Sequence, residues 1–422
     1  MKRILLLFVL SILFQHTISA QCESSRYQEK IFEDIVIYKD VQYGSNINNI
    51  GKYQDLFMDV YMPDPDLDTI ALRPVILFMH GGAYVAGSKN KNTMQFMGNE
   101  FSRRGYVAIP VQYRLEKSTV DFEPILEFGN VVEWNKAIVR SIHDIKGAIR
   151  HLKYLAAEEG NPYHIDTNNI TLYGSSAGAI GVMHSVYLDD EDEKKNLWNL
   201  AINELGGLEG NTSKHLQYGS TNTVRNLILD SGAFSDVNWI GDKNDVDVLS
   251  LHHDKDPTVP YGAGCYYIVA CHLGKYFGSA KYVPYLEGNG TRVVAHKVSG
   301  VGHPVDDLDP QFVLEKSIDF LYDSQCKYDT TQYDIPTNIK KSTISEVKIY
   351  PNPNNGQFQI FSKEIAKDAL IQIFSLSGRL VYEQKSINIS QDIQLDEPNG
   401  LYFLSITDQY GAQSISKLSI TR

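Results

Sequence analysis

Short apolar runs alternate with longer amphipathic stretches over the first three quarters of the chain. The runs cover residues 75–79, 107–111, 170–173, 227–229, 246–251 and 292–298. The clearest helical pattern extends from Trp134 to about Glu158. Its apolar side chains recur at three- or four-residue steps, at Ile138, Ile142, Ile145, Ile149 and Leu152. Strands that alternate with helices predict an α/β fold whose mostly parallel central sheet is covered on both faces, with an active site at the carboxyl ends of the strands.

The pattern changes near residue 325. Residues 324–345 are polar and lack apolar periodicity, which is typical of a linker. Beyond them, strand-like runs are punctuated by the turn signals NNG, SG and NG, which predict a small, sandwich-like all-β module. We therefore expect a catalytic domain over residues 21–326, a linker over 327–345 and a C-terminal module over 346–422.

The first twenty residues, MKRILLLFVLSILFQHTISA, have the layout of a secretory signal peptide: a basic start, an apolar run and a small residue at Ala20. The alternative is an uncleaved membrane anchor. The apolar run is short for a bilayer span and no second run follows, so we favour cleavage and expect no stable transmembrane segment in the mature chain.

Length, charge and cysteine usage narrow the class further. The chain has 422 residues, more than one core usually accommodates, and its formal net charge of -12 argues against a nucleic-acid partner. Export makes the four cysteines candidates for disulfides, in any of three connectivities. The close pair Cys265 and Cys271 would staple one loop and leave Cys22 to pair with Cys326. A zinc site is less favoured, because neither pair has C-x-x-C spacing.

The stretch ITLYGSSAGAIG, residues 170–181, places two serines between glycines at a predicted strand-to-helix turn. The frame Gly174-x-Ser176-x-Gly178 is that of a nucleophile elbow, in which small flanking residues let the serine Oγ stand exposed at the edge of the sheet. In this interpretation Ser175 only fills the turn. A tight turn without chemistry explains the motif equally well, so other elements have to decide.

Three further elements follow apolar strands in the order that this chemistry requires. The strand at 75–79 leads into His80-Gly81-Gly82-Ala83-Tyr84, whose glycine N–H groups, with that of Ala177, would form an oxyanion hole. The other two are acids and a histidine: Asp254 and Asp256 lie in the loop after the strand at 246–251, and His303 follows the strand at 292–298. Each feature alone has an ordinary explanation. The glycines are consistent with a plain turn, an aspartate can cap a helix, and His303 can be a loop histidine without a catalytic role. Their joint order predicts a Ser-Asp-His triad.

Residues 35–322 resemble secreted bacterial carboxylesterases of the α/β-hydrolase superfamily, in the branch with an HGG oxyanion loop. The matching pieces are DLFMDVYMP, RPVILFMHGGAYVAGS, GYVAIPVQYRL, DIKGAIRHLKY, ITLYGSSAGA, HHDKDPTVPY and GVGHP. The loop HHDKDPTVPY commonly reads His-Gly-Thr-x-Asp-x-x-Val-Pro in such enzymes, which aligns the catalytic acid with Asp256 and places Asp254 at the threonine. Ala83 stands where an HGGG loop has its third glycine, which we expect to narrow the acyl pocket while leaving the N–H donors in place.

The region from about residue 346 to 422 resembles the sorting domain of the type IX secretion system, through YPNPNNGQF, IFSLSGRLV, NGLYFLSI and the final KLSI. The resemblance implies that the type IX machinery is a partner and that the protein is released or attached to the outer-membrane surface. A carbohydrate-binding or adhesive β-module is the alternative.

Together these features predict a secreted serine esterase that uses Ser176, His303 and Asp256 through an acyl-enzyme, with no cofactor or metal. Small acyl esters are the expected substrates, and esters on a polysaccharide or a polyester are an alternative. A peptidase or amidase, and a non-catalytic surface binding protein, are further alternatives. Residues 115–134 and 189–224 are candidate caps over the pocket.

Overall fold

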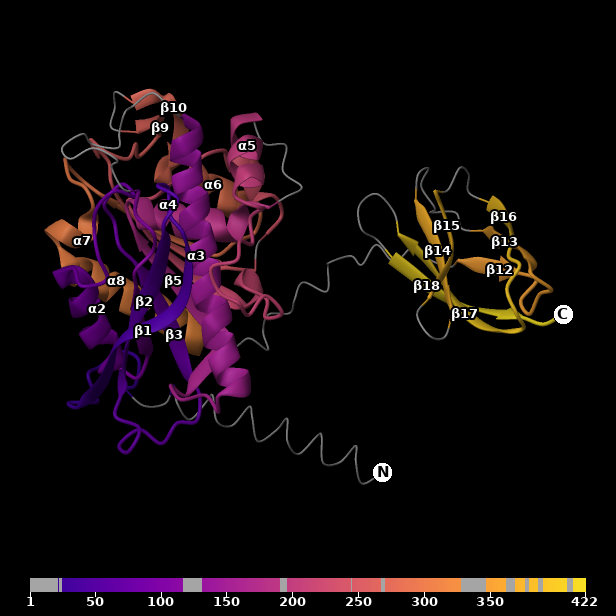
Figure 1. Cartoon of the computed structure of the whole chain (residues 1–422), viewed down its shortest axis with the longest axis horizontal. Helices are drawn as coiled ribbons and strands as arrows, with labels where there is room; N and C mark the ends of the chain where they lie inside the picture. Colours follow the sequence, from indigo (N-terminus) through magenta and orange to yellow (C-terminus); the bar gives the residue numbers. More distant parts are fainter. Residues whose placement is uncertain are drawn as a thin grey trace. The chain divides into compact units, whose positions relative to one another are not determined.

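The computed structural model describes residues 22, 25–116, 131–189, 196–243, 245–266, 270–327, 347–361, 369–375, 379–385, 390–407 and 413–422. It divides into two compact units, with the boundary between residues 327 and 328 (Figure 1). The predicted signal peptide and nearly all of the predicted linker lie outside the described residues.

The first unit is built on a mostly parallel sheet, as the sequence predicts. In the described part of the chain this sheet has eight strands in the order β1-β2-β4-β3-β5-β6-β8-β11. Their bounds are β1 Ile35–Ile47, β2 Tyr53–Pro63, β3 Arg73–Met79, β4 Val107–Val111, β5 Ile165–Ser175, β6 Val224–Asp230, β8 Asp247–His253 and β11 Val293–Val298. The pairs β1–β2 and β2–β4 are antiparallel, and every pair from β4 to β11 is parallel. The six predicted runs fall on β3, β4, β5, β6, β8 and β11, so those strand predictions are confirmed.

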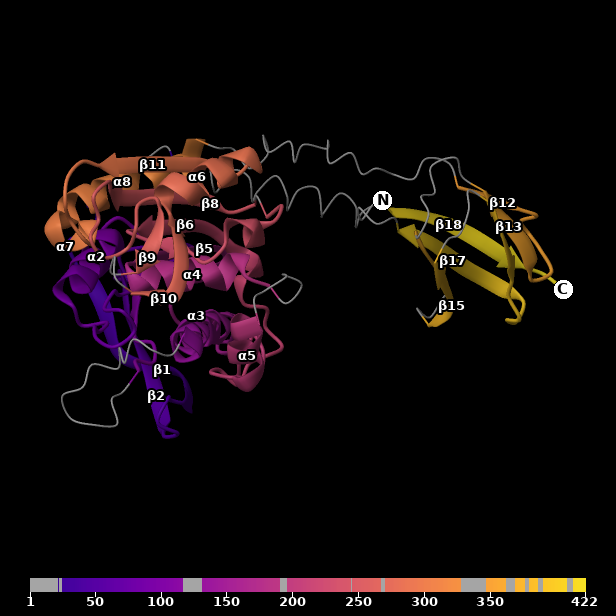
Figure 2. The same cartoon turned by 90° about the horizontal axis from the view of Figure 1, so that it is seen from above.

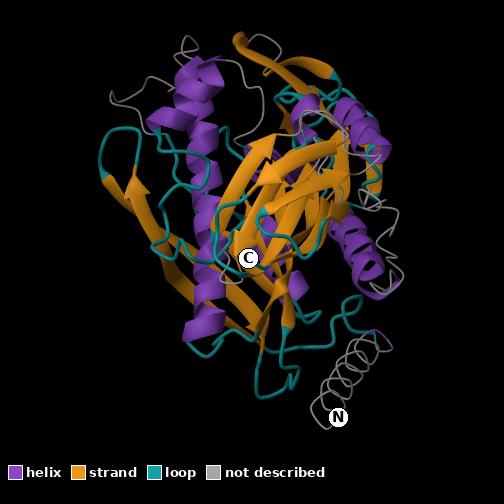
Figure 3. Cartoon of the chain, turned by 90° about the vertical axis from the view of Figure 1, so that its right-hand side faces the viewer, coloured by secondary structure: helices purple, strands orange, loops and turns teal. Residues whose placement is uncertain are grey.

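Helices cover both faces of the sheet, because the central strands bury side chains on both sides. Their bounds are α2 Asn92–Ser102, α3 Val131–Glu158, α4 Ala177–Tyr187, α5 Asn196–Glu204, α6 Ser279–Gly288, α7 Val305–Leu308 and α8 Pro310–Tyr322. Within β3, Leu77 and Met79 belong to one buried cluster with α3 and α4, while Ile76 and Phe78 belong to another with α2 and α8. Helix α3, predicted from Trp134, begins three residues earlier at Val131. Figure 2 shows α3 and α4 beside the sheet, and Figure 3 distinguishes helices from strands in this mixed architecture.

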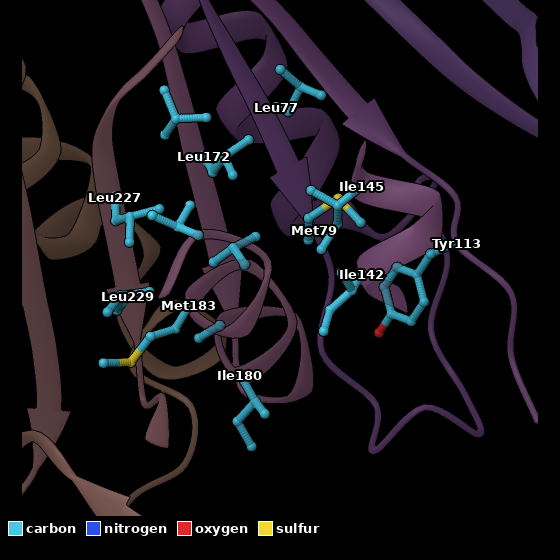
Figure 4. Close-up of a cluster of buried hydrophobic side chains, with 14 of the residues drawn as sticks. Leu77, Met79, Tyr113, Ile142, Ile145, Leu172, Ile180, Met183, Leu227 and Leu229 are labelled. Carbon is cyan, nitrogen blue, oxygen red and sulfur yellow. The ribbon is translucent and has the colours of Figure 1, made fainter. Parts of the chain in front are cut away.

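The larger cluster lies between the sheet and helices α3 and α4 (Figure 4). Its labelled side chains come from neighbouring strands and from both helices, and include Leu77, Leu172, Leu227, Ile145 and Ile180. All five are fully buried. This packing holds β5 and α4 against each other, and the turn between them carries Ser176.

A second, smaller sheet lies in the stretch between β6 and β11. It is antiparallel, in the order β7-β10-β9, with β7 at Ala233–Phe234, β9 at Ala263–Tyr266 and β10 at Ala270–Gly278. Short helical turns η1, η2 and η3 occupy Thr221–Thr223, Val237–Ile240 and Asp323–Lys327. Of the helices in the described part of the chain, none combines the length and apolar character that a membrane crossing needs.

The second unit is all-β. Its described strands form two antiparallel sheets, β12-β13-β16 and β15-β14-β17-β18. Their bounds are β12 Lys348–Tyr350, β13 Gln357–Phe361, β14 Leu370–Ser375, β15 Leu380–Lys385, β16 Ser390–Gln394, β17 Gly400–Thr407 and β18 Gln413–Ile420. Side chains of both sheets share one core, among them Phe358, Ile393, Ile371 and Leu404. The predicted sandwich-like module is therefore present.

A disulfide joins Cys22 to Cys326, as predicted. Cys265 is also disulfide-bonded. The side chain of Cys271 lies outside the described residues, so its pairing with Cys265 stays a prediction.

Candidate active site

Ser176 lies on the turn between β5 and α4. Its backbone has φ 53° and ψ -118°, a strained conformation for a residue with a side chain. Two glycines permit the turn: a Cβ on Gly174 would lie 2.5 Å from the Ala179 Cα, and one on Gly178 would lie 2.2 Å from the Met79 carbonyl oxygen. The predicted elbow geometry is thus present. The serine also precedes the first turn of α4, where the positive end of the helix dipole favours developing negative charge.

His303 and Asp256 complete a hydrogen-bonded row with this serine. The Ser176 Oγ lies 2.7 Å from His303 Nε2, and His303 Nδ1 lies 2.7 Å from Asp256 Oδ2. His303 follows β11 and Asp256 follows β8, so both come from the carboxyl ends of parallel strands. The structure therefore brings the three predicted triad residues together in hydrogen-bonding order.

The environment of Asp256 keeps its carboxylate ionised. Its Oδ1 accepts hydrogen bonds from the backbone N–H groups of Thr258 and Val259, at 2.7 and 2.9 Å. Burial by itself would raise the pKa of Asp256, but hydrogen bonds from His252 and His303 outweigh it and lower the pKa to about 2. A permanent negative charge beside His303 Nδ1 fixes the ring so that Nε2 faces the serine.

Asp254, the other candidate acid, has a structural role. Its Oδ1 accepts a hydrogen bond from the backbone N–H of Gly300 at 2.8 Å, and its own N–H donates to the Val298 carbonyl at 2.9 Å. Asp254 therefore holds the loop that carries His303 against the end of β8.

The loop after β3 approaches the serine closely. A Cβ on Gly81 would lie 3.1 Å from the Ser176 Cβ, so a larger residue would crowd the nucleophile. Gly82 has φ +121°, and a Cβ there would lie 2.2 Å from the Ala86 carbonyl oxygen. Ala83, at the third position of the loop, also has positive φ, at 51°. The two glycines therefore let the backbone of this loop pass close to Ser176, where a residue with a Cβ would clash.

His80 stabilises this loop as a neutral ring. Burial lowers its pKa to about 4, so the ring is neutral, and Nδ1 carries the proton because its partner at 2.8 Å, the Gly81 carbonyl, can only accept. The ring stacks on Tyr113 with 4.3 Å between centroids, and the Tyr113 hydroxyl donates to the His80 carbonyl. Tyr84 holds the other side, because its hydroxyl donates to the Ala177 carbonyl at 2.8 Å.

A cavity of about 300 Å³ opens onto the serine. Its lining residues are Gly81, Gly82, Ala83, Gly87, Lys91, Ser176, His303, Pro304 and Asp307. Lys91 and Asp307 form an ion pair, with 2.6 Å between Nζ and Oδ1. The predicted oxyanion glycines therefore share one cavity with the serine and the histidine. Ala177, the third predicted donor, is the first residue of α4, where an N–H has no partner within the helix.

The sequence did not predict the contacts of two residues next to Ser176, His303 and Asp256. His252 lies with its Nε2 3.3 Å from Asp256 Oδ2, and its Nδ1 lies 2.8 Å from the Ser279 hydroxyl. The family pattern His-Gly-Thr-x-Asp contained the signal, since its histidine falls on His252. Ser175, interpreted as filling the turn, instead donates to Asp306 Oδ1 at 2.9 Å. That correction needs tertiary structure, because Asp306 is far from Ser175 in sequence.

The candidate cap segments are only partly described. Residues 117–130 and 190–195 lie outside the described residues. The later part, residues 196–224, contains α5 and a loop that is fastened to α3 by ion pairs from Glu209 to Lys146 and Arg150. A role over the pocket stays a prediction.

Comparison with known proteins finds family matches in two separate parts of the chain. Residues 58–243 match the family BD-FAE, and residues 348–421 match the Secretion system C-terminal sorting domain. Gut esterase 1 of Caenorhabditis briggsae is 28% identical over 115 residues, which are 26% of this chain and 17% of that protein. The chain thus aligns with only a small part of this curated relative.

Two solved structures are also similar. A truncated carbohydrate esterase from gut microbiota is 17% identical, with a TM-score of 0.44, over 70% of this chain and 98% of the other. Esterase Est2 of the Planctomycetes species Thermogutta terrifontis is 19% identical, with a TM-score of 0.42, over 67% and 92%.

The family match thus identifies a BD-FAE domain, of the esterase type of α/β-hydrolase, over residues 58–243. More narrowly, the chain joins a BD-FAE domain to a type IX secretion sorting domain. The sorting domain marks the protein for export, either to be secreted or to be attached to the cell surface.

Proposed function

We propose that this protein is an exported serine esterase that hydrolyses carboxylic esters at Ser176. The observation that carries the proposal is the hydrogen-bonded row from Ser176 Oγ to His303 Nε2 and from His303 Nδ1 to Asp256, with 2.7 Å at each step. These contacts have the length and order that nucleophile activation by a general base requires.

In the proposed mechanism, the Ser176 oxygen attacks the ester carbonyl carbon while His303 Nε2 takes the hydroxyl proton. The tetrahedral intermediate collapses when His303 returns that proton to the leaving alkoxide, which departs as an alcohol and leaves an acyl-enzyme. Water then removes the acyl group. His303 takes a proton from the water, whose oxygen attacks the acyl carbon, and the second tetrahedral intermediate collapses as His303 returns the proton to the Ser176 oxygen and the acid leaves. Asp256 stays ionised throughout and stabilises the imidazolium that forms twice per cycle.

The developing negative charge is expected to meet the backbone N–H groups of Gly81, Gly82 and Ala177. Gly81 and Gly82 line the same cavity as Ser176, and Ala177 opens α4. Fixed backbone donors stabilise an oxyanion without reorganisation, and one such donor is worth about 10²–10³ in kcat.

The size of the cavity favours short acyl groups. At about 300 Å³ it lies at the lower end of ligand pockets. Ala83, only 7% exposed, projects a methyl group where a third glycine would leave space. Acetyl and similarly small esters are therefore the proposed substrates, on either a small molecule or a polymer whose chain stays outside the cavity.

The test is hydrolysis of p-nitrophenyl esters of increasing acyl length by the full mature chain, comparing wild type with Ser176→Ala. We expect kcat/KM to be highest for acetyl and propionyl esters and to fall by about 10⁴-fold or more in the variant. A folded variant that retains most of the wild-type rate would contradict the proposal.

Two other functions give different results in the same assay series. A peptidase or amidase would cleave p-nitroanilides faster than the matching esters. A non-catalytic binding protein would hydrolyse neither kind of substrate, and a fluorophosphonate probe would not label Ser176. The proposal requires fluorophosphonate labelling in wild type and none at this position in Ser176→Ala.

A further inference from the structure

Two carboxyl groups lie buried beside the turn that carries the nucleophile. Asp230 is the last residue of β6, and Asp306 lies in α7, three residues after His303. Both are fully buried, and the backbone N–H of Asp306 donates to Asp230 Oδ2 at 2.7 Å. Two adjacent carboxylates repel strongly in a buried site, so such a pair holds one proton between its members. Burial and the neighbouring charge raise the pKa of Asp230 well above its ordinary value, and burial also raises that of Asp306.

Asp230 contacts both catalytic segments. Its backbone carbonyl accepts the N–H of Ser176 at 2.8 Å. Its side chain accepts the N–H groups of Val305 and Asp306, at 3.0 and 2.7 Å. Val305 and Asp306 are separated from His303 only by Pro304. Asp230 therefore fixes both Ser176 and the loop that carries His303 to the end of β6.

Asp306 makes a second connection between the same segments. Its Oδ1 accepts the hydroxyl of Ser175 at 2.9 Å, and its Oδ2 accepts the hydroxyl of Tyr173 at 3.0 Å. Both donors are on β5, within three residues of Ser176. The loop that carries His303 is therefore tied to β6 by backbone donors and to β5 by side-chain donors.

We propose that Asp230 and Asp306 act as a pair of positioning residues that sets the separation of Ser176 and His303. The inference rests on the proposed esterase function, since it assigns the pair to the same reaction. Neither carboxyl group touches the substrate. The pair links the two segments through the hydrogen bonds described above, so without either member the loop that carries His303 loses anchors beside the elbow.

The test compares Asp306→Ala with Asp306→Asn in the full mature chain, with p-nitrophenyl acetate as substrate. The amide in D306N keeps the size of the side chain and one oxygen acceptor, so it can still accept the Ser175 hydroxyl, while the Tyr173 hydroxyl loses its acceptor. We expect D306A to lower kcat by about 10- to 100-fold with KM changed less than about threefold, since misplaced reacting groups lose this much. We expect D306N to keep kcat within about fivefold of wild type.

Asp247→Ala is the matched control for the loss of a buried acid. Asp247 opens β8 and pairs with Arg292 at 2.9 Å, away from the residues that line the cavity. D247A should lower the melting temperature without lowering kcat. A folded D306A with wild-type kcat would overturn the inference, and so would equal losses of kcat in D306A and D306N, or in D306A and D247A.

Ser175→Ala decides the question if D306A fails to fold, because it removes one hydroxyl and leaves the pair in place. A three- to tenfold loss of kcat at unchanged KM supports the inference, and wild-type kcat overturns it. A folded wild type that neither hydrolyses esters nor reacts with fluorophosphonate contradicts the proposed function and this inference together. An active wild type with an unimpaired D306A contradicts the inference alone.

Discussion

At the scale of single residues, the two aspartates in the loop after β8 have different partners. Asp256 faces His303 Nδ1 at 2.7 Å, whereas Asp254 accepts the backbone N–H of Gly300. The first carboxylate is placed to orient the imidazole, and the second is placed to hold the loop.

Asparagine substitutions are expected to separate these roles. Asp256→Asn keeps the shape of the side chain but favours the wrong histidine tautomer, so kcat should fall by about 10³- to 10⁴-fold. Asp254→Asn keeps an acceptor for Gly300 N–H and should change kcat less than about threefold. Steady-state kinetics on p-nitrophenyl acetate check both. Equal losses in the two variants would contradict the assignment of Asp256 as the triad acid.

The residues that sequence could find are those with a local signal. Ser176 stands between glycines, His303 follows a glycine-rich loop, and Asp256 lies in a motif. Ser175 and Asp230 carry no such signal, because their partners lie on segments distant in sequence. Their roles depend on how β5, β6 and α7 are packed, which apolar periodicity does not specify.

At the scale of elements, helix α4, which follows the nucleophile, carries a buried histidine in its last turn. His184 is fully buried, with its Nδ1 2.8 Å from the Ile180 carbonyl and its Nε2 2.9 Å from the Ser235 hydroxyl. Its ring stacks on Trp198 of α5. Burial lowers the pKa of His184 to about 4, so the packed helix holds a neutral ring.

This histidine should make stability depend on pH. Between about pH 6.5 and 4 the unfolded chain takes up a proton at His184 and the native protein does not, so the free energy of unfolding falls as the pH falls. The contribution is up to about 1.4 kcal/mol per pH unit for one group. His184→Asn should therefore have a lower melting temperature at pH 7 and a smaller further decrease from pH 7 to 5.

The control is His164→Asn, at an exposed position with φ 54°, a conformation that asparagine tolerates. Its melting temperature should decrease between pH 7 and 5 as steeply as that of wild type. Thermal unfolding of the full chain gives all three curves. A decrease in H184N as steep as in wild type would show that this histidine is not a source of the pH dependence.

Elements with regular periodicity were predictable and irregular ones were not. Helix α3 and the parallel strands follow apolar patterns that their burial requires. The β7-β10-β9 sheet was not predicted, because β7 has only two residues and the sequences of β9 and β10 lack a clear alternation of apolar and polar residues. Strands β1 and β2 were absent from the predicted runs as well; β1 has partly exposed positions on both faces, so its pattern is weak.

At the scale of the whole molecule, the chain divides near the residue where its composition changes. The loss of apolar periodicity near residue 325 indicates a boundary, and the structure divides into its two units between residues 327 and 328. The sequence of the polar linker predicts the boundary but no arrangement of the two units, because polar linkers specify no packing.

The Cys22–Cys326 disulfide joins the first and last parts of the first unit that the structure describes. Cys22 follows the predicted signal-peptide cleavage site, and Cys326 immediately precedes the predicted linker. The Tyr322 hydroxyl also donates to the Cys22 carbonyl at 3.3 Å, so α8 contacts the same N-terminal residue. Cleavage in the linker would therefore release a unit whose two ends remain covalently joined.

Replacing both cysteines by serine should lower the free energy of unfolding by about 2–4 kcal/mol, because the disulfide restricts a very long loop of the unfolded chain. The esterase kcat of Cys22→Ser/Cys326→Ser should stay within about twofold of wild type, because neither residue lines the cavity beside Ser176. Urea unfolding without reductant measures the first quantity and p-nitrophenyl acetate hydrolysis the second. Identical unfolding midpoints would mean that the disulfide adds no stability. A large loss of kcat would mean that the disulfide also affects the geometry of the active site. The expected outcome is lower stability at constant kcat. It would show that the disulfide stabilises the first unit, while other contacts position the catalytic residues.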